Sequence, residues 1–237
     1  MHVPDGVVYA STALGTWVLG GGVIAYSLKK SREDLEKGSS DGAGEDVLAD
    51  RRIPVVGLTA AFIFAAQMVT VPIAGGTSAH LLGGAMAGIM LGPWIGTLVM
   101  AVVYLVQAIG FADGGITAYG ANVLGMGVVP AIGGYYFFRA VTVLLPRTRV
   151  VYLGTVALTS FLTVGLASAL ISCFIVFGGP LPLATFPIMI GVHMLVGILE
   201  AVISTAVLAA VLNTRPDLLV NQDRLPVKNS GGEEVTA

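Results

Sequence analysis

The sequence has little charge, one cysteine and three histidines, and these shortages narrow its class at once. Asp, Glu, Lys and Arg make up 11% of the 237 residues, whereas 55% are hydrophobic, and the mean hydropathy is +0.88. Soluble domains carry about 25% charged residues. The composition therefore excludes an ordinary soluble domain and indicates an integral membrane protein.

The scarcity of cysteine and of catalytic motifs excludes several functions. Cys173 stands alone inside a hydrophobic run, so no disulfide can form within the chain and a thiolate metal site is not expected. A net charge of −2 gives no basic footprint for nucleic acid. The sequence contains no phosphate-binding Gly-Lys-Ser/Thr loop, no His-Glu-x-x-His and no Gly-x-Ser-x-Gly. We therefore expect a protein that is not an enzyme and does not itself hydrolyse ATP.

Long apolar runs predict an all-α fold with seven transmembrane helices. A helix needs about 20 apolar residues to cross a bilayer, and the runs lack the alternating pattern of a membrane barrel. The third run is short, and we expect the residues before it to extend it. The expected spans are Val7–Leu28, Ile53–Ile73, Leu81–Leu91, Trp94–Phe111, Ala118–Phe138, Val150–Phe177 and Leu183–Leu212.

The basic residues predict the orientation of these spans. All 12 Lys and Arg residues fall on one side, in the linker 29–52, between the fifth and sixth spans, and after the last span. Basic loops stay on the cytoplasmic side of a membrane. We therefore expect the N-terminus outside and the C-terminus in the cytoplasm. The chain then forms one transmembrane domain over residues 1–213, containing a mobile, charged cytoplasmic linker at 29–52, and a cytoplasmic tail over 214–237.

The first two residues offer an unusual set of nitrogen donors. If Met1 keeps a free α-amine, that amine, the His2 backbone nitrogen and the His2 imidazole can close on one ion in two fused chelate rings. Three nitrogens in a plane leave a fourth position open, which suits Ni(II) or Cu(II) and, less strictly, Co(II). A polar residue on a frayed terminus is the simpler alternative.

A second imidazole lies on the same predicted side of the membrane. His80 follows the small-residue loop 74–79, and the glycines there allow the backbone to pass close to a site. His80 can complete a plane of four nitrogens, or can simply bond to a loop carbonyl at the start of a helix. Asp113 lies in the next outward loop.

Four further polar residues lie in or beside the apolar spans. His193 and Glu200 are seven residues apart and share one helix face. A glutamate in a span needs a partner or a cavity, so the two residues either orient the metal ligands or gate access to the site, or else form a structural polar contact between helices. Gln107 and Asn122 can orient metal-binding histidines from a second shell, or can tie helices together.

The motifs that carry these residues resemble the CbiM/NikM family, the substrate-binding membrane components of cobalt and nickel energy-coupling-factor transporters. The start Met-His-Val-Pro-Asp-Gly resembles the family's Met-His-Ile-Pro-Asp-Gly, and the run 75–84, Gly-Gly-Thr-Ser-Ala-His-Leu-Leu-Gly-Gly, resembles its second histidine motif. Gln107 with the run 113–122 resembles the central motif, and His193 to Glu200 resembles the motif of the last helix.

The resemblance implies a Ni(II) or Co(II) substrate held by the Met1 amine, the backbone and side-chain nitrogens of His2, and the His80 imidazole. It also implies a place in a prokaryotic cytoplasmic membrane. The implied partners are a transmembrane coupling subunit, ATPase subunits and a small accessory membrane protein. Two alternatives remain at this point: the same architecture with an organic micronutrient as substrate, and an intramembrane enzyme that uses His193 and Glu200.

Overall fold

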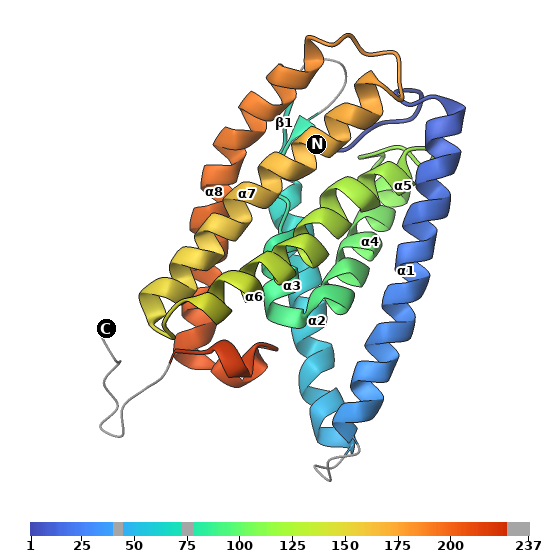
Figure 1. The fold of residues 1–237 in the computed structure, drawn as a ribbon. Coiled ribbons are helices and arrows are strands. Elements are labelled where there is room, and N and C mark those ends of the chain that lie inside the picture. The colour runs from blue at the N-terminus through green and yellow to red at the C-terminus, as the bar shows by residue number, and fades with distance from the viewer. Residues whose placement is uncertain (40–44, 73–77, 227–237) are drawn as a thin grey trace, which may run out of the picture.

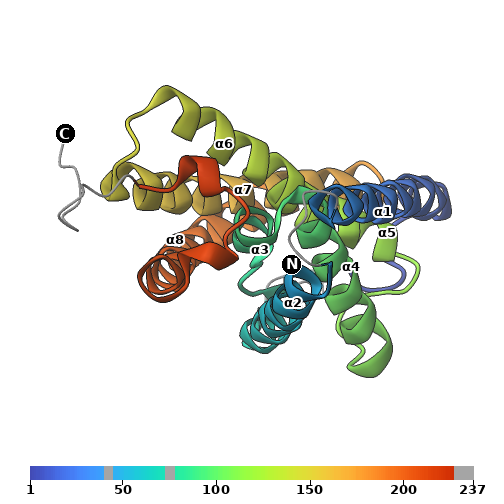
Figure 2. The ribbon, with the colours of Figure 1, turned by 90° about the horizontal axis from the view of Figure 1, so that it is seen from below.

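The protein is a bundle of helices in which one short helix is surrounded by longer ones (Figures 1 and 2). The computed structural model describes residues 1–39, 45–72 and 78–226. The helices are α1 (Ala10–Ser39), α2 (Glu45–Gln67), α3 (Gly84–Leu91), α4 (Pro93–Gly110), α5 (Tyr119–Asn122), α6 (Gly134–Leu144), α7 (Arg149–Val176) and α8 (Thr185–Thr214). The π-helical segment η2 (Val123–Gly133) joins α5 to α6, the 3₁₀ turns η3 (Pro216–Leu218) and η4 (Gln222–Arg224) follow α8, and strands β1 (Val71–Pro72) and β2 (Ser78–Ala79) form a short antiparallel pair.

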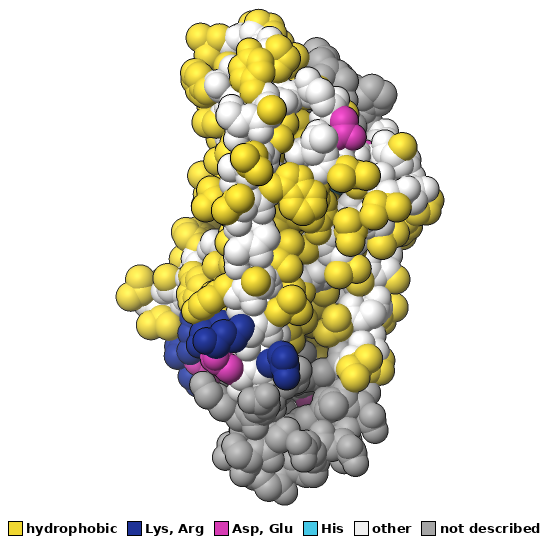
Figure 3. All heavy atoms as spheres, turned by 90° about the vertical axis from the view of Figure 1, so that its right-hand side faces the viewer, with side chains coloured by type: hydrophobic (Ala, Val, Ile, Leu, Met, Phe, Trp, Pro, Cys, Tyr) yellow, Lys and Arg dark blue, Asp and Glu magenta, His cyan; other side chains and the backbone are white. Residues whose placement is uncertain are grey.

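The predicted all-helical membrane fold is confirmed at this level. Within the described residues, four helical segments are long and apolar enough to cross a bilayer: α4, the continuous helix from Tyr119 to Leu144, α7 and α8. Such helices satisfy every backbone group internally, as a hydrocarbon environment requires. Figure 3 shows hydrophobic side chains over the middle of one face, with Lys and Arg gathered toward one end.

The expected extension of the third span is wrong. The segment before α3 is not helical, and α3 itself has eight residues. At 1.5 Å per residue such a helix is about 12 Å long, far less than the hydrocarbon core. All eight residues of α3 are buried, and the non-helical residues 79–83 before it are buried or half-buried, which is where such backbone is tolerated in a membrane protein.

Helices α1 and α2 extend into the charged linker from both sides. α1 continues to Ser39 and α2 begins at Glu45, so helix occupies both ends of the linker, and the remaining residues 40–44 lie outside the described part. Lys, Arg, Glu and Leu are good helix formers, which explains the extension.

The first part of the tail packs against the C-terminal end of α3. The backbone nitrogen of Val220 donates to the Met90 carbonyl at 3.2 Å, and the Asn221 side chain donates to the Ile89 carbonyl at 3.1 Å. These bonds satisfy carbonyls that the end of a helix leaves without an internal partner. The tail therefore covers one end of the buried helix.

A glycine lets two helices touch backbone to backbone beside the N-terminal segment. A side-chain carbon added at Gly120 of α5 would fall within hard contact of the Thr16 carbonyl and the Trp17 nitrogen of α1. Gly15, on the exposed side of α1, has open space at the same position. Small residues commonly allow such close crossing in membrane helices.

We expect Gly120→Ala to lower the free energy of unfolding by about 1–3 kcal/mol, the usual cost of overpacking. Gly15→Ala is the matched control and should be neutral or slightly stabilising, because alanine favours the helix. Thermal unfolding of both variants in detergent checks this. Equal stability of the two variants would contradict the backbone contact between α1 and α5.

Candidate metal centre

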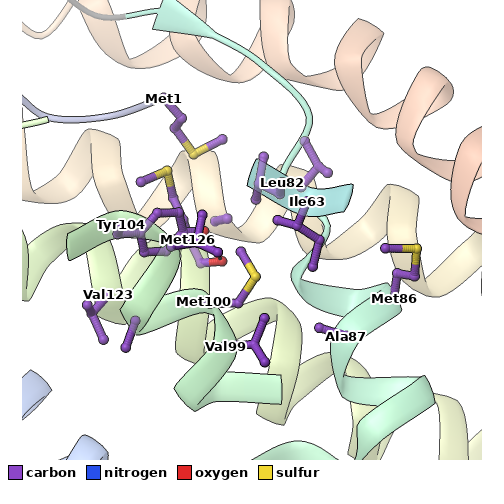
Figure 4. Close-up of a cluster of buried hydrophobic side chains, with 14 of the residues drawn as sticks. Met1, Ile63, Leu82, Met86, Ala87, Val99, Met100, Tyr104, Val123 and Met126 are labelled. Atoms are coloured by element: carbon purple, nitrogen blue, oxygen red, sulfur yellow. Dashed lines mark hydrogen bonds between the residues drawn. The ribbon is translucent and has the colours of Figure 1, made fainter. Parts of the chain in front are cut away.

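The N-terminal segment enters the bundle instead of fraying from it. Met1 and Val3 are fully buried, and His2 is 3% exposed. Figure 4 shows the Met1 side chain in a cluster of buried residues with Tyr104 and Met126. The alternative of a frayed terminus is therefore excluded for this chain, because burial of three successive residues requires specific packing.

Hydrogen bonds from the segment 113–122 hold the N-terminal backbone in place. The Val3 nitrogen donates to Oδ1 of Asn122 at 2.9 Å, and the Val3 carbonyl accepts from Nδ2 of Asn122 at 3.2 Å and from the Gly115 nitrogen at 2.8 Å. Nearer the surface, Oδ1 of Asp5 accepts from the nitrogen and hydroxyl of Thr117 at 2.7 and 2.5 Å. These bonds position the first residues precisely from both sides of Val3.

His80 reaches the same point from a different part of the chain. It follows β2 and is 2% exposed, and its Nδ1 lies 2.7 Å from the Leu81 carbonyl. A carbonyl only accepts, so Nδ1 carries the proton and Nε2 carries the lone pair. Nε2 is buried and makes no hydrogen bond within the described residues. A buried imidazole nitrogen of this kind is suited to bind a metal ion.

The two imidazoles are stacked against each other. The ring centroids of His2 and His80 are 4.4 Å apart and the rings are inclined by 23°. The edge of Tyr104 meets the His2 ring at a centroid distance of 5.4 Å. The predicted metal ligands Met1, His2 and His80 therefore lie together, although His80 is far from the other two in the sequence.

Asp113 is the charged neighbour of this cluster. Its Oδ1 lies 3.1 Å from Nδ1 of His2, and this close contact with His2 lowers the pKa of the Asp113 carboxyl. Burial lowers the pKa of the His2 imidazole and lowers the pKa of the Met1 amine well below its usual value. Both shifts favour the neutral amine and the neutral imidazole, which are the forms that bind metal.

The remaining predicted residues lie around the cluster, each with a definite partner. Asn122 binds Val3, Gln107 donates to Oε1 of Gln67 at 3.0 Å, and Nδ1 of His193 lies 2.7 Å from the Met189 carbonyl of its own helix. Glu200 accepts from the backbone nitrogens of Leu82 and Gly83. The residues 75–77 of the second histidine motif lie outside the described residues.

Two residues were missed by the sequence analysis. Gln67 is fully buried at the end of α2 and donates to the Leu82 carbonyl at 2.5 Å, and Tyr104 lines the His2 ring. Gln67 carried a usable signal, because an amide at the end of an apolar run needs a partner. Tyr104 carried none, since an aromatic residue in a span is usual.

The fold and this cluster define a class of multi-pass helical membrane protein that buries its own amino terminus inside the bundle. The chain belongs to the CbiM family, whose model is described as the cobalt uptake substrate-specific transmembrane region and matches residues 2–218.

Curated relatives and a solved structure agree with this assignment. A candidate fused nickel transport protein, NikMN, of Archaeoglobus fulgidus is 38% identical over 92% of this chain and 68% of its own length. A candidate metal transport protein of Haloquadratum walsbyi is 38% identical over 94% of both chains. The crystal structure of a truncated transition metal transporter is 25% identical, with a TM-score of 0.75 over 90% of this chain and 99% of that one.

Proposed function

We propose that this chain is the substrate-binding component of an ATP-driven nickel or cobalt importer. It binds the ion through four nitrogens: the Met1 amine, the backbone and Nδ1 nitrogens of His2, and Nε2 of His80. The observation that carries the proposal is the contact between His2 and His80 beside a buried amino terminus. Two polar segments from distant parts of the chain are brought together there, and burying them has a cost that a bound ion offsets.

A metal ion fits this site better than an organic molecule does. The groups that converge here are an amine and two imidazoles, with the His2 and His80 rings in contact and Tyr104 against the His2 ring. Imidazole and amine nitrogens are also the donors that Ni(II) and Co(II) accept. The organic-micronutrient alternative is therefore less well supported.

Binding requires the His2 ring to turn. The chelate uses Nδ1, which faces Asp113 in this structure. A half-turn about the Cβ–Cγ bond exchanges Nδ1 with Cδ2 and makes Nε2 the ring nitrogen nearer to Asp113. The Nε2–H group can then donate a hydrogen bond to the Asp113 carboxylate, which orients the ring as carboxylates commonly orient metal-binding histidines.

The wider arrangement is also part of the proposal. Seven membrane-crossing segments, with the N-terminus outside and the basic tail in the cytoplasm, would let the site take up its ion from outside. The support is the uneven distribution of Lys and Arg in the sequence. Transport would need ATPase subunits, because the chain has no phosphate-binding loop of its own. A coupling subunit and a small accessory membrane protein would complete the transporter.

The proposed chelate predicts a dependence of nickel affinity on pH. A planar Ni(II) complex displaces the His2 amide proton at any pH, so the affinity should fall about tenfold for each unit by which pH drops. The lowered pKa values of the Met1 amine and His2 mean that protonation of these groups adds to the loss only under more acidic conditions. Nickel titrations between about pH 8 and pH 5 check this. An affinity that stays constant over that range would contradict the amide ligand.

A further inference from the structure

Glu200 is a carboxylate buried in the membrane helix α8, and both of its oxygens are used by backbone groups of another segment. Oε2 accepts from the Leu82 nitrogen at 2.8 Å and Oε1 from the Gly83 nitrogen at 2.6 Å. The side chain is 2% exposed. Leu82 and Gly83 precede α3 and are not helical, so their N–H groups need partners from elsewhere.

The first of these bonds involves the same peptide group that holds His80. The N–H of Leu82 and the carbonyl of Leu81 are the two ends of one planar peptide unit. Glu200 binds the N–H end, and Nδ1 of His80 donates to the carbonyl end at 2.7 Å. A continuous chain of bonds therefore runs from the Glu200 carboxylate through this peptide to the His80 ring.

This arrangement has two physical consequences for His80. Because the peptide is planar, fixing its N–H end fixes the direction of the carbonyl that holds the ring. The negative carboxylate that accepts the Leu82 N–H also polarises the peptide and makes the Leu81 carbonyl a stronger acceptor, since linked hydrogen bonds reinforce one another. Both effects favour the tautomer with the proton on Nδ1 and the lone pair on Nε2.

We propose that Glu200 is a positioning residue for His80, which acts through the Leu81–Leu82 peptide to keep Nε2 available as the fourth metal ligand. This inference rests on the proposed function. It assigns to α8 the role that a carboxylate or carbonyl plays behind a metal-binding histidine, with one peptide group inserted between the carboxylate and the ring.

A purely structural role for Glu200 makes a different prediction, and Gln67 separates the two. Gln67 donates to the Leu82 carbonyl, which belongs to the next peptide group, between Leu82 and Gly83. Gln67 thus anchors the same segment from α2 without binding the peptide that holds His80. If anchoring is all that matters, Gln67→Leu and Glu200→Gln should affect the site alike.

The first readout is the tautomer of His80 in the metal-free protein. Glutamine has one acceptor oxygen, so Glu200→Gln loses one of the two backbone bonds and the negative charge. With imidazole ¹⁵N labels on only three histidines, His80 can be assigned by substitution. We expect a pure Nδ1-protonated signal in the wild type and in Gln67→Leu, and a mixture of tautomers in Glu200→Gln.

The second readout is nickel affinity. We expect Glu200→Gln to raise the Kd by about 10–100-fold, the range for partners that orient metal ligands. In a His80→Ala background the same substitution should have no further effect, because a residue that acts through His80 has nothing left to position. Ser204→Ala, which removes a buried hydroxyl one turn further along the same face of α8, is the matched control and should bind as the wild type does.

Each outcome decides the inference. A wild-type tautomer signal and Kd in Glu200→Gln, an equal loss in Gln67→Leu, or a full further loss in the His80→Ala background would overturn it. If Glu200→Gln does not fold, Glu200→Asp keeps the charge but shortens the reach by one methylene, and it carries the same two readouts. If the wild type binds no nickel or cobalt, the proposed function fails, and the metal-free tautomer signal still decides the role of Glu200.

Discussion

One residue added in front of Met1 should abolish tight nickel binding, and this is the largest effect we expect. The extension converts the Met1 amine into an amide, which removes one ligand and breaks a chelate ring. It also places extra atoms where Met1 is fully buried against the core. We expect the affinity to fall by at least about 1,000-fold, or about 4 kcal/mol.

The measurement is nickel and cobalt binding to purified protein with a native and with an extended terminus. A protease-cleavable extension provides the control, because cleavage that restores Met1 should restore binding in the same preparation. Unfolding temperatures of the two forms separate loss of a ligand from loss of the fold. Equal affinity of the two forms would place the site elsewhere, and His193 with Glu200 would then be the region to test.

His80→Ala should have the second largest effect. Its Nε2 is buried, carries the lone pair and lies in the ring stacked on His2, so its removal takes away the fourth nitrogen. A direct ligand should matter more than a residue that only orients one, so we expect a loss of affinity beyond the roughly 100-fold upper end for orienting partners. The substitution leaves the bonds from Asn122 to Val3 intact, so the fold should persist.

His193→Ala is the comparison that gives this result its meaning. His193 is also buried, but its Nδ1 is held by the Met189 carbonyl within α8. We expect its affinity for nickel to stay within about threefold of the wild type, which is less than 1 kcal/mol. Isothermal titration of both variants, with circular dichroism to confirm helix content, makes the comparison. A larger loss in His193→Ala than in His80→Ala would move the site into α8.

The N-terminal donor set was recognisable without a structure because its chemistry is local. The amine, amide and imidazole at Met1-His2 are neighbours in the chain, so their ability to chelate follows from covalent geometry alone. That His80 joins them is a tertiary contact between residues 78 positions apart, and sequence spacing cannot encode it. The sequence could only place both on one side of a membrane.

The hydrogen bonds that hold His80 in place could not be predicted from the sequence for the same reason. Glu200 and the Leu81–Leu82 peptide come from distant parts of the chain, and the bond between them involves a backbone nitrogen. Backbone groups carry no signature in a residue pattern. The expected extension of the third span failed because it assumed that this helix must cross the bilayer, and a short helix enclosed by other helices does not have to.

By itself, then, the sequence determined that the chain is a helical membrane protein and that its first two residues carry nitrogen atoms spaced for chelation, because composition and covalent neighbours decide both. Only the tertiary structure decided that the chain before α3 is not helical, that His2 stacks on His80 and that Glu200 binds the backbone nitrogen of Leu82, close to His80. The physical reason is that these features depend on which backbone N–H and carbonyl groups find partners inside the bundle. In a medium without water, every such group must find one.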